Sequence, residues 1–362
     1  MKKYVITLLS VLNIAFAFAQ APIGYYYSAN GKSSNELRLK LQNIINNHTN
    51  ITYGGLWSAF QATDVRTDGY VWDMYSNCNF IFVQHQDNGT QGGSECQKYN
   101  REHSVPQSWF NGAEDMYADI FHIYPTDKKV NADRGDNPFG EVNNPTYTSA
   151  NGSKRGNSSF AGYSGIAFEP IDAYKGDFAR TYFYMATRYI NKNFTSGEGN
   201  IVFTFNNSEC NLTSYAVNLF LKWHRNDPVS QKEINRNNVI YSDYQHNRNP
   251  FIDHPELAEY IWGDSVGYIW QNGGVSAIND IALFMPEISP NPSSEFILVN
   301  DNDVFQDFDY HIFTIQGKII LSGKSSVNRQ INISNIASGI YFIKISTENT
   351  YFIQKIIKTI KN

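Results

Sequence analysis

A pair of prolines near the C-terminus divides this chain into two parts with different sequence patterns. The segment Ser289-Pro290-Asn291-Pro292 ends any regular element, because proline lacks the backbone N–H and fixes its own φ angle. After it, apolar and polar residues alternate in short runs, which is the period of strands. The runs are Phe296–Val299, Tyr310–Thr314, Lys318–Leu321, Gln330–Ile333, Ile340–Ile345 and Tyr351–Ile357, and Gly317, Gly323 and Gly339 mark turns between them. Residues 290–362 are therefore predicted to form a small β-sandwich.

The residues before the prolines include segments with helical spacing of apolar residues, namely Asn35–Asn47, Phe178–Ile190 and Leu212–Arg225. Asn144–Gly165 is rich in Asn, Ser and Gly and predicts an exposed loop. A chain of 362 residues is long for one domain, and 41% hydrophobic with 17% charged residues suits a globular protein. We therefore expect an α+β protein, with a mixed helical domain over residues 20–275, a linker over 276–289 and an all-β domain over 290–362.

The first 19 residues have the pattern of an export signal. Lys2 and Lys3 precede an apolar stretch over Tyr4–Phe18, and Ala17 and Ala19 fit a cleavage site after Ala19. The stretch is too short for a comfortable transmembrane helix, and no other segment is apolar enough to span a bilayer. The protein is therefore predicted to be exported, with no membrane span.

Export changes the interpretation of the three cysteines. An oxidising compartment allows one disulfide and leaves one thiol. We favour Cys78–Cys96 over pairings with Cys210, because it closes the shorter loop. Three buried free thiols remain an alternative, and no CxxC pattern indicates zinc.

The stretch from Asn100 to Gly140 carries the clearest chemical signal. It begins NREHSVPQSWF, with Glu102 next to His103, and continues DIFHIYPTDKKVNADRGDNPFG, with Asn131 inside it. Glutamate and asparagine are hard oxygen ligands, and a histidine can be neutral and accept a proton near pH 7. These residue types are what hydrolysis of a phosphodiester with one Mg²⁺-type ion requires.

This stretch and three further blocks resemble, in the same order, the bacterial endonuclease I family of ββα-metal (His-Me finger) nucleases. The blocks are Asp68–Ser76, Asn100–Gly140, Trp223–Asn237 and Gln245–Gly263, and together they cover roughly Tyr26 to Asn272. The resemblance implies a nuclease domain built around a ββα-metal core. It also implies His103 as the general base, and Glu102 and Asn131 as ligands of Mg²⁺, with Mn²⁺ or Ca²⁺ as alternatives.

The local sequence constrains how these residues come together. Neighbouring residues on a regular strand face opposite sides, so Glu102 and His103 can reach one phosphate only if the strand ends or bulges there. Pro106 is consistent with a strand that has just ended. Asn131 is predicted to lie on a short helix that Thr126 caps and Gly135 ends, with Asp127 in its first turn.

Cationic residues near Asn131 are candidates for substrate binding. Arg134 follows Asn131 by three residues on the same helical face, and we assign it to phosphate binding and catalysis, with a surface ion pair to Asp127 or Asp133 as the alternative. Lys128 and Lys129 are further candidates for contacts with substrate, and Arg101 and His122 for supporting roles. For His122 a structural role is favoured.

The chain departs from the family pattern at three places. No Arg or Lys lies between His103 and Lys128, where some family members hold an arginine. Phe121 stands where histidine is usual and Asp136 where asparagine is common. The cation that clamps the phosphate must therefore come from elsewhere in the chain.

The net charge of −5 means that any basic surface for nucleic acid is local. Binding to nucleic acid should accordingly be modest and salt-sensitive. The candidates for that surface are Lys128, Lys129, Arg134, Lys154, Arg155, Arg225, Arg236 and Arg248.

The C-terminal segment resembles the sorting domains of the type IX secretion system of Bacteroidetes. The resemblance is carried by Asn291-Pro292, Gly317, Gly339-Ile340-Tyr341 and Lys355-Ile356-Ile357. It implies contact with the secretion machinery and release from, or display on, a Gram-negative cell. A generic β-sandwich accessory domain is the alternative.

Together these features predict a secreted monomeric endonuclease that cleaves DNA, and as an open question RNA, with little sequence preference. Two alternatives remain from the sequence. One is a surface protein that binds polyanions through a decayed nuclease site, and the other is a phosphodiesterase for small substrates.

Overall fold

A computed structural model describes residues 21–89, 93–112, 114–271, 287–300, 308–315, 317–325, 329–346 and 351–360 of the chain. The chain divides into two compact units, Met1–Gly274 and Val275–Asn362. The predicted signal segment, residues 1–19, and the predicted linker as far as residue 286 lie outside the described residues. Within the described ranges, no helix has both the length and the apolar character needed to cross a bilayer.

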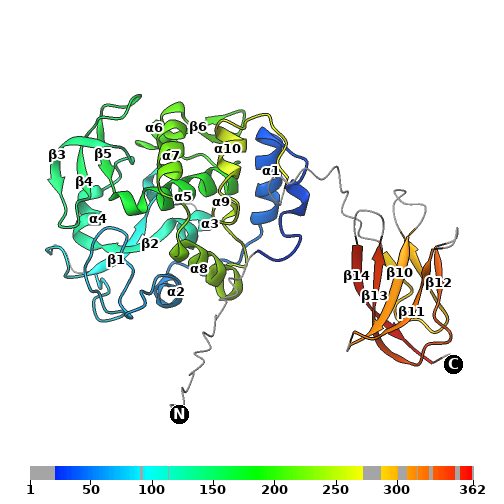
Figure 1. The fold of residues 1–362 in the computed structure, drawn as a ribbon. Coiled ribbons are helices and arrows are strands. Elements are labelled where there is room, and N and C mark those ends of the chain that lie inside the picture. Colours follow the sequence, from blue (N-terminus) through cyan, green and yellow to red (C-terminus); the bar gives the residue numbers. More distant parts are fainter. Residues whose placement is uncertain are drawn as a thin grey trace, which may run out of the picture. The chain divides into compact units, whose positions relative to one another are not determined.

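The first unit mixes helices with short antiparallel sheets (Figure 1). Its helices are α1 (Ser34–Ile45), α2 (Leu56–Thr63), α3 (Glu114–Tyr117), α4 (Lys128–Arg134), α5 (Lys175–Arg188), α6 (Gly199–Val202), α7 (Ser214–Asn226), α8 (Gln231–Val239), α9 (Pro250–Asp253) and α10 (Leu257–Trp262). Its strands are β1 (Tyr99–His103), β2 (Ile123–Asp127), β3 (Val142–Thr148), β4 (Lys154–Ser158), β5 (Ile166–Glu169), β6 (Phe203–Asn206) and β7 (Glu209–Leu212). Single turns of 3₁₀ helix cover Tyr27–Ala29, Gln107–Phe110, Ile120–His122 and Asp172–Tyr174, and a π-helical turn covers Ile240–Tyr244.

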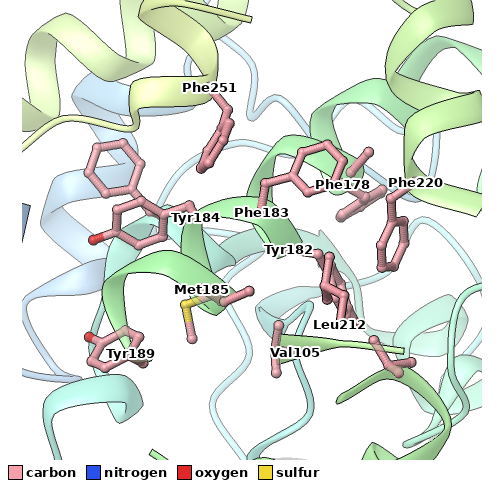
Figure 2. Close-up of a cluster of buried hydrophobic side chains, with 14 of the residues drawn as sticks. Val105, Phe178, Tyr182, Phe183, Tyr184, Met185, Tyr189, Leu212, Phe220 and Phe251 are labelled. Carbon is pink, nitrogen blue, oxygen red and sulfur yellow. The ribbon is translucent and has the colours of Figure 1, made fainter. Parts of the chain in front are cut away.

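Helix α5 forms the centre of this unit. It is buried along nearly its whole length and contacts α1, α7 and α9. Figure 2 shows its aromatic side chains surrounded by residues of other elements, among them Val105, Phe220 and Phe251. A helix that is buried on nearly all sides lies in a core, so α5 is the scaffold against which the other elements pack.

Several charged side chains are buried within this core, and each has a partner of opposite charge. Arg180 of α5 donates two hydrogen bonds to Glu233 of α8, Arg236 pairs with Asp64, and Arg248 pairs with Asp253. A buried charge is tolerated only when it is paired and hydrogen-bonded. The polar blocks around residues 223–263 are therefore a network that holds helices together.

The three helices predicted from apolar spacing are confirmed as α1, α5 and α7. The loop predicted over Asn144–Gly165 is wrong, because β3 and β4 pair there and β4 pairs with β5. Most side chains of β3 are exposed, so no alternation of apolar residues marks the strand. Backbone pairing forms this sheet, and Gly156 allows the close approach, since a Cβ there would lie 2.7 Å from the Asn144 carbonyl oxygen.

The second unit is a β-sandwich, as predicted. One sheet has the strand order β12–β9–β8 and the other β11–β10–β13–β14, all antiparallel. The strands are β8 (Glu287–Ser289), β9 (Phe296–Asn300), β10 (Asp309–Thr314), β11 (Ile319–Lys324), β12 (Gln330–Asn332), β13 (Gly339–Ser346) and β14 (Tyr351–Lys358). Buried isoleucines from both sheets, such as Ile297 and Ile343, form its core.

Two details of this unit differ from the sequence-based expectation. Strand β8 precedes the prolines and was not predicted, because three residues are too few to show alternation. Gly323 was predicted to mark a turn but lies inside β11. A Cβ at Gly323 would lie 2.7 Å from the Tyr310 hydroxyl, so the glycine makes room for the ring of the neighbouring strand.

Candidate active site

The segment singled out in the sequence folds into two antiparallel strands followed by a helix, β1, β2 and α4 (Figure 1). Glu102 pairs with Tyr124, and His103 pairs with Ile123 as the last residue of β1. The strand therefore ends at His103, which meets the condition under which Glu102 and His103 can reach one phosphate.

Helix α4 begins directly after β2. The Asp127 carboxylate caps it by accepting from the backbone N–H groups of Lys129 and Val130, at 2.8 and 3.1 Å. The predicted cap, Thr126, is wrong, because Asp127, the last residue of β2, occupies the cap position and does not lie in the first turn. Gly135 ends the helix as predicted, with a φ of +57° that glycine adopts without strain. The same Asp127 carboxylate accepts from the backbone N–H of Cys96 at 2.6 Å.

A disulfide joins Cys78 to Cys96, with Cα atoms 5.2 Å apart. It ties the approach to β1 to the segment that follows α2, beside the cap of α4. Cys210 is a free, buried thiol. Across the described ranges, the only cluster of potential metal-binding side chains formed from His, Cys, Asp and Glu is Cys78, Cys96 and Asp127. Its sulfurs are in the disulfide and are not thiolate ligands, so this cluster is not a metal site.

His103 is nearly buried, with 8% of its surface exposed, and its ring packs against those of Tyr53 and Tyr117, which also contact each other. Its Nε2 lies 3.2 Å from the Tyr117 carbonyl oxygen. A carbonyl can only accept, so Nε2 carries the proton and Nδ1 is left with its lone pair. Burial lowers the pKa of His103 to about 3, assisted by the nearby His122. The ring is therefore neutral near pH 7 and able to take a proton at Nδ1.

Glu102 is buried on the other face of β1. Its Oε1 accepts from the Tyr75 hydroxyl at 2.8 Å and from the guanidinium of Arg134. Burial raises its pKa, and the charge of Arg134 opposes that effect. No hydrogen bond to Oε2 is found in the described part of the chain, so this oxygen remains available as a ligand.

Asn131 approaches the same face of β1 from α4. Its side-chain amide donates to the side-chain oxygen of Asn100 at 2.9 Å. Asn100 and Glu102 lie two residues apart and so share one face of the strand. Asn131 and Glu102 therefore lie on one side of the unit and offer one amide and one carboxylate oxygen. A carboxylate oxygen and an amide oxygen are hard donors of the type that Mg²⁺ takes, and this ion completes its coordination with waters in protein sites.

Arg134 does not lie where the sequence analysis expected it. It is 1% exposed, donates to Glu102 and also donates to the carbonyl oxygens of His103 and Ser104, at 2.9 and 2.7 Å. A buried Arg134 paired with Glu102 is not placed for the predicted phosphate contact. The alternative, a surface ion pair with Asp127 or Asp133, is wrong, because the carboxylate partner is Glu102. The face of α4 that carries Arg134 packs on β1, and Arg134 holds the end of that strand.

The two lysines predicted to contact substrate, Lys128 and Lys129, lie on α4 and already have partners. Lys128 pairs with Asp87 at 2.9 Å, and Lys129 pairs with Asp133 on the next turn of the helix. His122 is buried 5.4 Å from the His103 ring, and its Nε2 lies 2.6 Å from the Met116 carbonyl oxygen. Burial lowers the pKa of His122. It packs behind His103, and its Nδ1 has no hydrogen-bond partner among the described residues.

Several residues of the site were not predicted. Tyr75 holds Glu102, while Tyr53 and Tyr117 hold His103. The tyrosines come from distant segments, and the sequence shows only that aromatic residues are frequent, at 15%. Asn100 could have been found, because its alternation with Glu102 on a predicted strand puts both on one face.

Comparison with known proteins assigns this arrangement to a class of enzyme. The chain is 37% identical over 243 residues to the extracellular ribonuclease of Bacillus amyloliquefaciens, and 35% identical over 250 residues to that of Bacillus subtilis (strain 168). Each alignment spans 66% of this chain and 78% of the relative. The protein is a secreted nuclease, that is, a phosphodiester hydrolase.

The matching families give its identity more closely. Residues 33–256 match Endonuclease I, and the chain belongs to that family. Residues 287–359, which include the second unit's strands, match the secretion system C-terminal sorting domain. The presence of this type IX sorting domain indicates that the protein reaches the cell surface or the medium.

Proposed function

We propose that this protein is a metal-dependent endonuclease that cleaves DNA and RNA with little sequence preference. His103 acts as the general base, and Glu102 and Asn131 hold a single divalent ion, for which Mg²⁺ is the first candidate. The observation that carries the proposal is the end of β1. There His103, the last residue of the strand, keeps one ring nitrogen without a hydrogen bond to any described residue, its neighbour Glu102 keeps one carboxylate oxygen without one, and Asn131 lies on the Glu102 side of the strand.

Each residue of the site has a separate role in the proposed hydrolysis. A water molecule loses a proton to Nδ1 of His103 and forms a bond to phosphorus, while the bond from phosphorus to the 3′ oxygen breaks and that oxygen takes a proton from solvent. The Tyr117 carbonyl and the rings of Tyr53 and Tyr117 keep the His103 ring in the orientation that this transfer needs. A divalent ion at Glu102 and Asn131 would neutralise negative charge that develops on the phosphate and on the leaving oxygen.

This chemistry supports activity on both nucleic acids. The nucleophile is water, so the 2′ hydroxyl that distinguishes RNA takes no part in the reaction. The two Bacillus relatives are described as ribonucleases, and we propose that RNA is a substrate here as well as DNA. Among the described residues of the first unit, surface cations are largely paired with carboxylates. Binding should therefore rest on few phosphate contacts.

The test uses the purified exported protein with supercoiled plasmid and, separately, with a single-stranded RNA. Both should be cut with Mg²⁺ or Mn²⁺, and EDTA should abolish cleavage because oxygen ligands bind hard cations reversibly. Glu102→Ala should raise the Mg²⁺ concentration needed for half-maximal rate. Cleavage at full rate in excess EDTA would contradict the metal assignment. Cleavage of only DNA or only RNA would contradict the proposal that both are substrates.

A further inference from the structure

Arg101 differs from the other arginines near the candidate site in having no carboxylate partner. Arg134 pairs with Glu102, Arg236 with Asp64 and Arg66 with Asp68. Over the part of the chain that the structure describes, no ion pair involves Arg101, although the side chain is half-buried. A guanidinium cannot lose its charge at neutral pH. Its partial burial without a counter-ion therefore costs free energy that a bound anion would offset.

Two aromatic rings hold the Arg101 guanidinium. Its Cζ lies 3.4 Å from the centroid of the Tyr53 ring and 4.4 Å from that of Trp57. One nitrogen, Nη1, donates to the Tyr53 backbone carbonyl at 2.6 Å. The N–H donors of a guanidinium lie in its own plane, so contact with a ring face leaves them directed outward. Apart from an interaction of the guanidinium with the Tyr53 side chain, no hydrogen bond from Nε or Nη2 is found among the described residues. These two donors form one side of the planar fork.

Arg101 also lies beside the proposed base. Arg101 and His103 are two residues apart on β1 and so share one face of the strand. Tyr53 contacts both, since its ring stacks on His103 with centroids 5.6 Å apart and an angle of 20° between the planes. The same ring therefore fixes the position of the cation and of the base relative to each other.

We propose that Arg101 binds a phosphate of the nucleic acid strand next to the bond that is cut, with Tyr53 and Trp57 holding its guanidinium in place. This inference rests on the proposed function and names the phosphate-binding cation of that same site. The free edge of the guanidinium matches two phosphate oxygens, the bidentate geometry that arginine forms and lysine does not.

The other cations of the site are committed elsewhere. Arg134 is buried and donates to Glu102 and two backbone carbonyls. Lys128 and Lys129 pair with Asp87 and Asp133. Arg101 supplies the positive charge that the segment between His103 and Lys128 lacks.

The test separates binding from cleavage. Binding of a short, labelled single-stranded DNA is measured in EDTA over a range of salt concentrations, so that no catalysis is needed, and plasmid cleavage is measured with Mg²⁺. Arg101→Gln should weaken binding about tenfold or more and reduce the slope of log affinity against log salt by about 0.7, the value for one lost contact to a single strand. The value of kcat/KM should fall about 10- to 100-fold.

A matched control and a second variant keep the result interpretable. Arg66→Gln removes the same charge from a surface pair with Asp68 and should leave binding and cleavage unchanged. Arg101→Lys keeps the charge and the aliphatic stem and so should fold. It should show the salt slope of the unmodified protein but lose about tenfold in kcat/KM, because the planar fork is gone.

The outcomes distinguish the two proposals. If the unmodified protein cuts plasmid and both Arg101 variants bind and cut like it, Arg101 is a structural brace and the inference is overturned while the proposed function stands. If the unmodified protein binds DNA in EDTA with the expected loss in Arg101→Gln but cuts nothing with Mg²⁺, the inference stands and the proposed chemistry fails.

Discussion

The two faces of strand β1 differ in whether their charged side chains have partners of opposite charge. On the face that packs against α4, Glu102 and Arg134 are buried and bonded to each other, to Tyr75 and to backbone carbonyls. On the opposite face, Arg101 and His103 contact aromatic rings and have no carboxylate partner in the described structure. The first arrangement satisfies its charges internally and builds the fold. The second leaves donors and a lone pair for a substrate to use.

This difference between the faces indicates which arginine is the better candidate for binding a phosphate of the substrate. Arg134 has the better position in the sequence, one turn from Asn131, but its charge is already neutralised by Glu102. Arg101 has no such partner, and its neighbours fix its orientation without cancelling its charge. An unneutralised, well-held charge is the better candidate for a phosphate.

Replacing His103, the proposed base, should cause the largest loss of activity. His103 lies with Arg101 on the face of β1 that contacts aromatic rings. His103→Ala should lower kcat on plasmid DNA by roughly 10²–10⁴-fold, the range for loss of a general base, while DNA affinity in EDTA stays nearly unchanged. His311→Ala, in the sorting domain, serves as the control and should cut at the normal rate. Near-normal cleavage by the His103 variant would place the base elsewhere.

Removing the cation of the other face should damage the fold instead. Arg134→Ala leaves the buried Glu102 carboxylate without its partner and should lower the free energy of unfolding by about 3–5 kcal/mol. Arg66→Ala, which breaks an exposed pair with Asp68, should cost about 1 kcal/mol or less. Denaturant titrations of both variants measure the difference. Equal stabilities would show that the α4 face is not held by its buried charges.

The disulfide supports the loops that lead to both faces. Replacing Cys78 and Cys96 together by serine should lower the free energy of unfolding by about 3 kcal/mol, because the bond closes a loop over a sequence separation of 18 residues. Unfolding of the unmodified protein with and without dithiothreitol gives the comparison. The double variant should be indifferent to the reductant, and a reductant effect of the same size in that variant would point to another target.

Lowering the pH should reduce the free energy of unfolding through His103, by less for each pH unit than the loss expected for removing the disulfide. The pKa of His103 is lowered to about 3 in the folded protein, so the unfolded chain binds a proton at this residue below pH 6.5 while the folded chain does not. Its contribution to stability is therefore present above pH 6.5 and is lost as pH falls towards 3, by at most about 1.4 kcal/mol per unit. His103→Gln should show a shallower fall of unfolding free energy over this window. Identical slopes would mean that the ring is not buried in solution.

The sequence was informative wherever a residue's neighbours along the chain determine its environment. The alternation rule predicted that β1 ends or bulges at Glu102 and His103, and the strand ends there. The segment from Thr126 to Gly135 predicted the helix that carries Asn131. The sequence failed for Arg134, because spacing defines a helical face but not what that face packs against. It also failed over Asn144–Gly165, where backbone pairing forms strands without an apolar pattern.

Contacts between distant segments account for what could not be predicted. Tyr53 precedes His103 by 50 residues, and Tyr75 precedes Glu102 by 27, so neither has a local signal. With 24 tyrosines in the chain, composition alone cannot select the three that surround the site. The fold brings them together through the packing around α5.

The hydrogen bond from Nε2 of His103 to the Tyr117 carbonyl has a consequence for the proposed mechanism, because it leaves Nδ1 as the nitrogen that exchanges a proton. Because Nε2 is occupied, the proton taken from water must depart through the same nitrogen that received it. Under the proposed mechanism, the burial that lowers the pKa of His103 also favours return of that proton to solvent after each cut. The proposed base would then be regenerated between turnovers without a second residue to relay the proton.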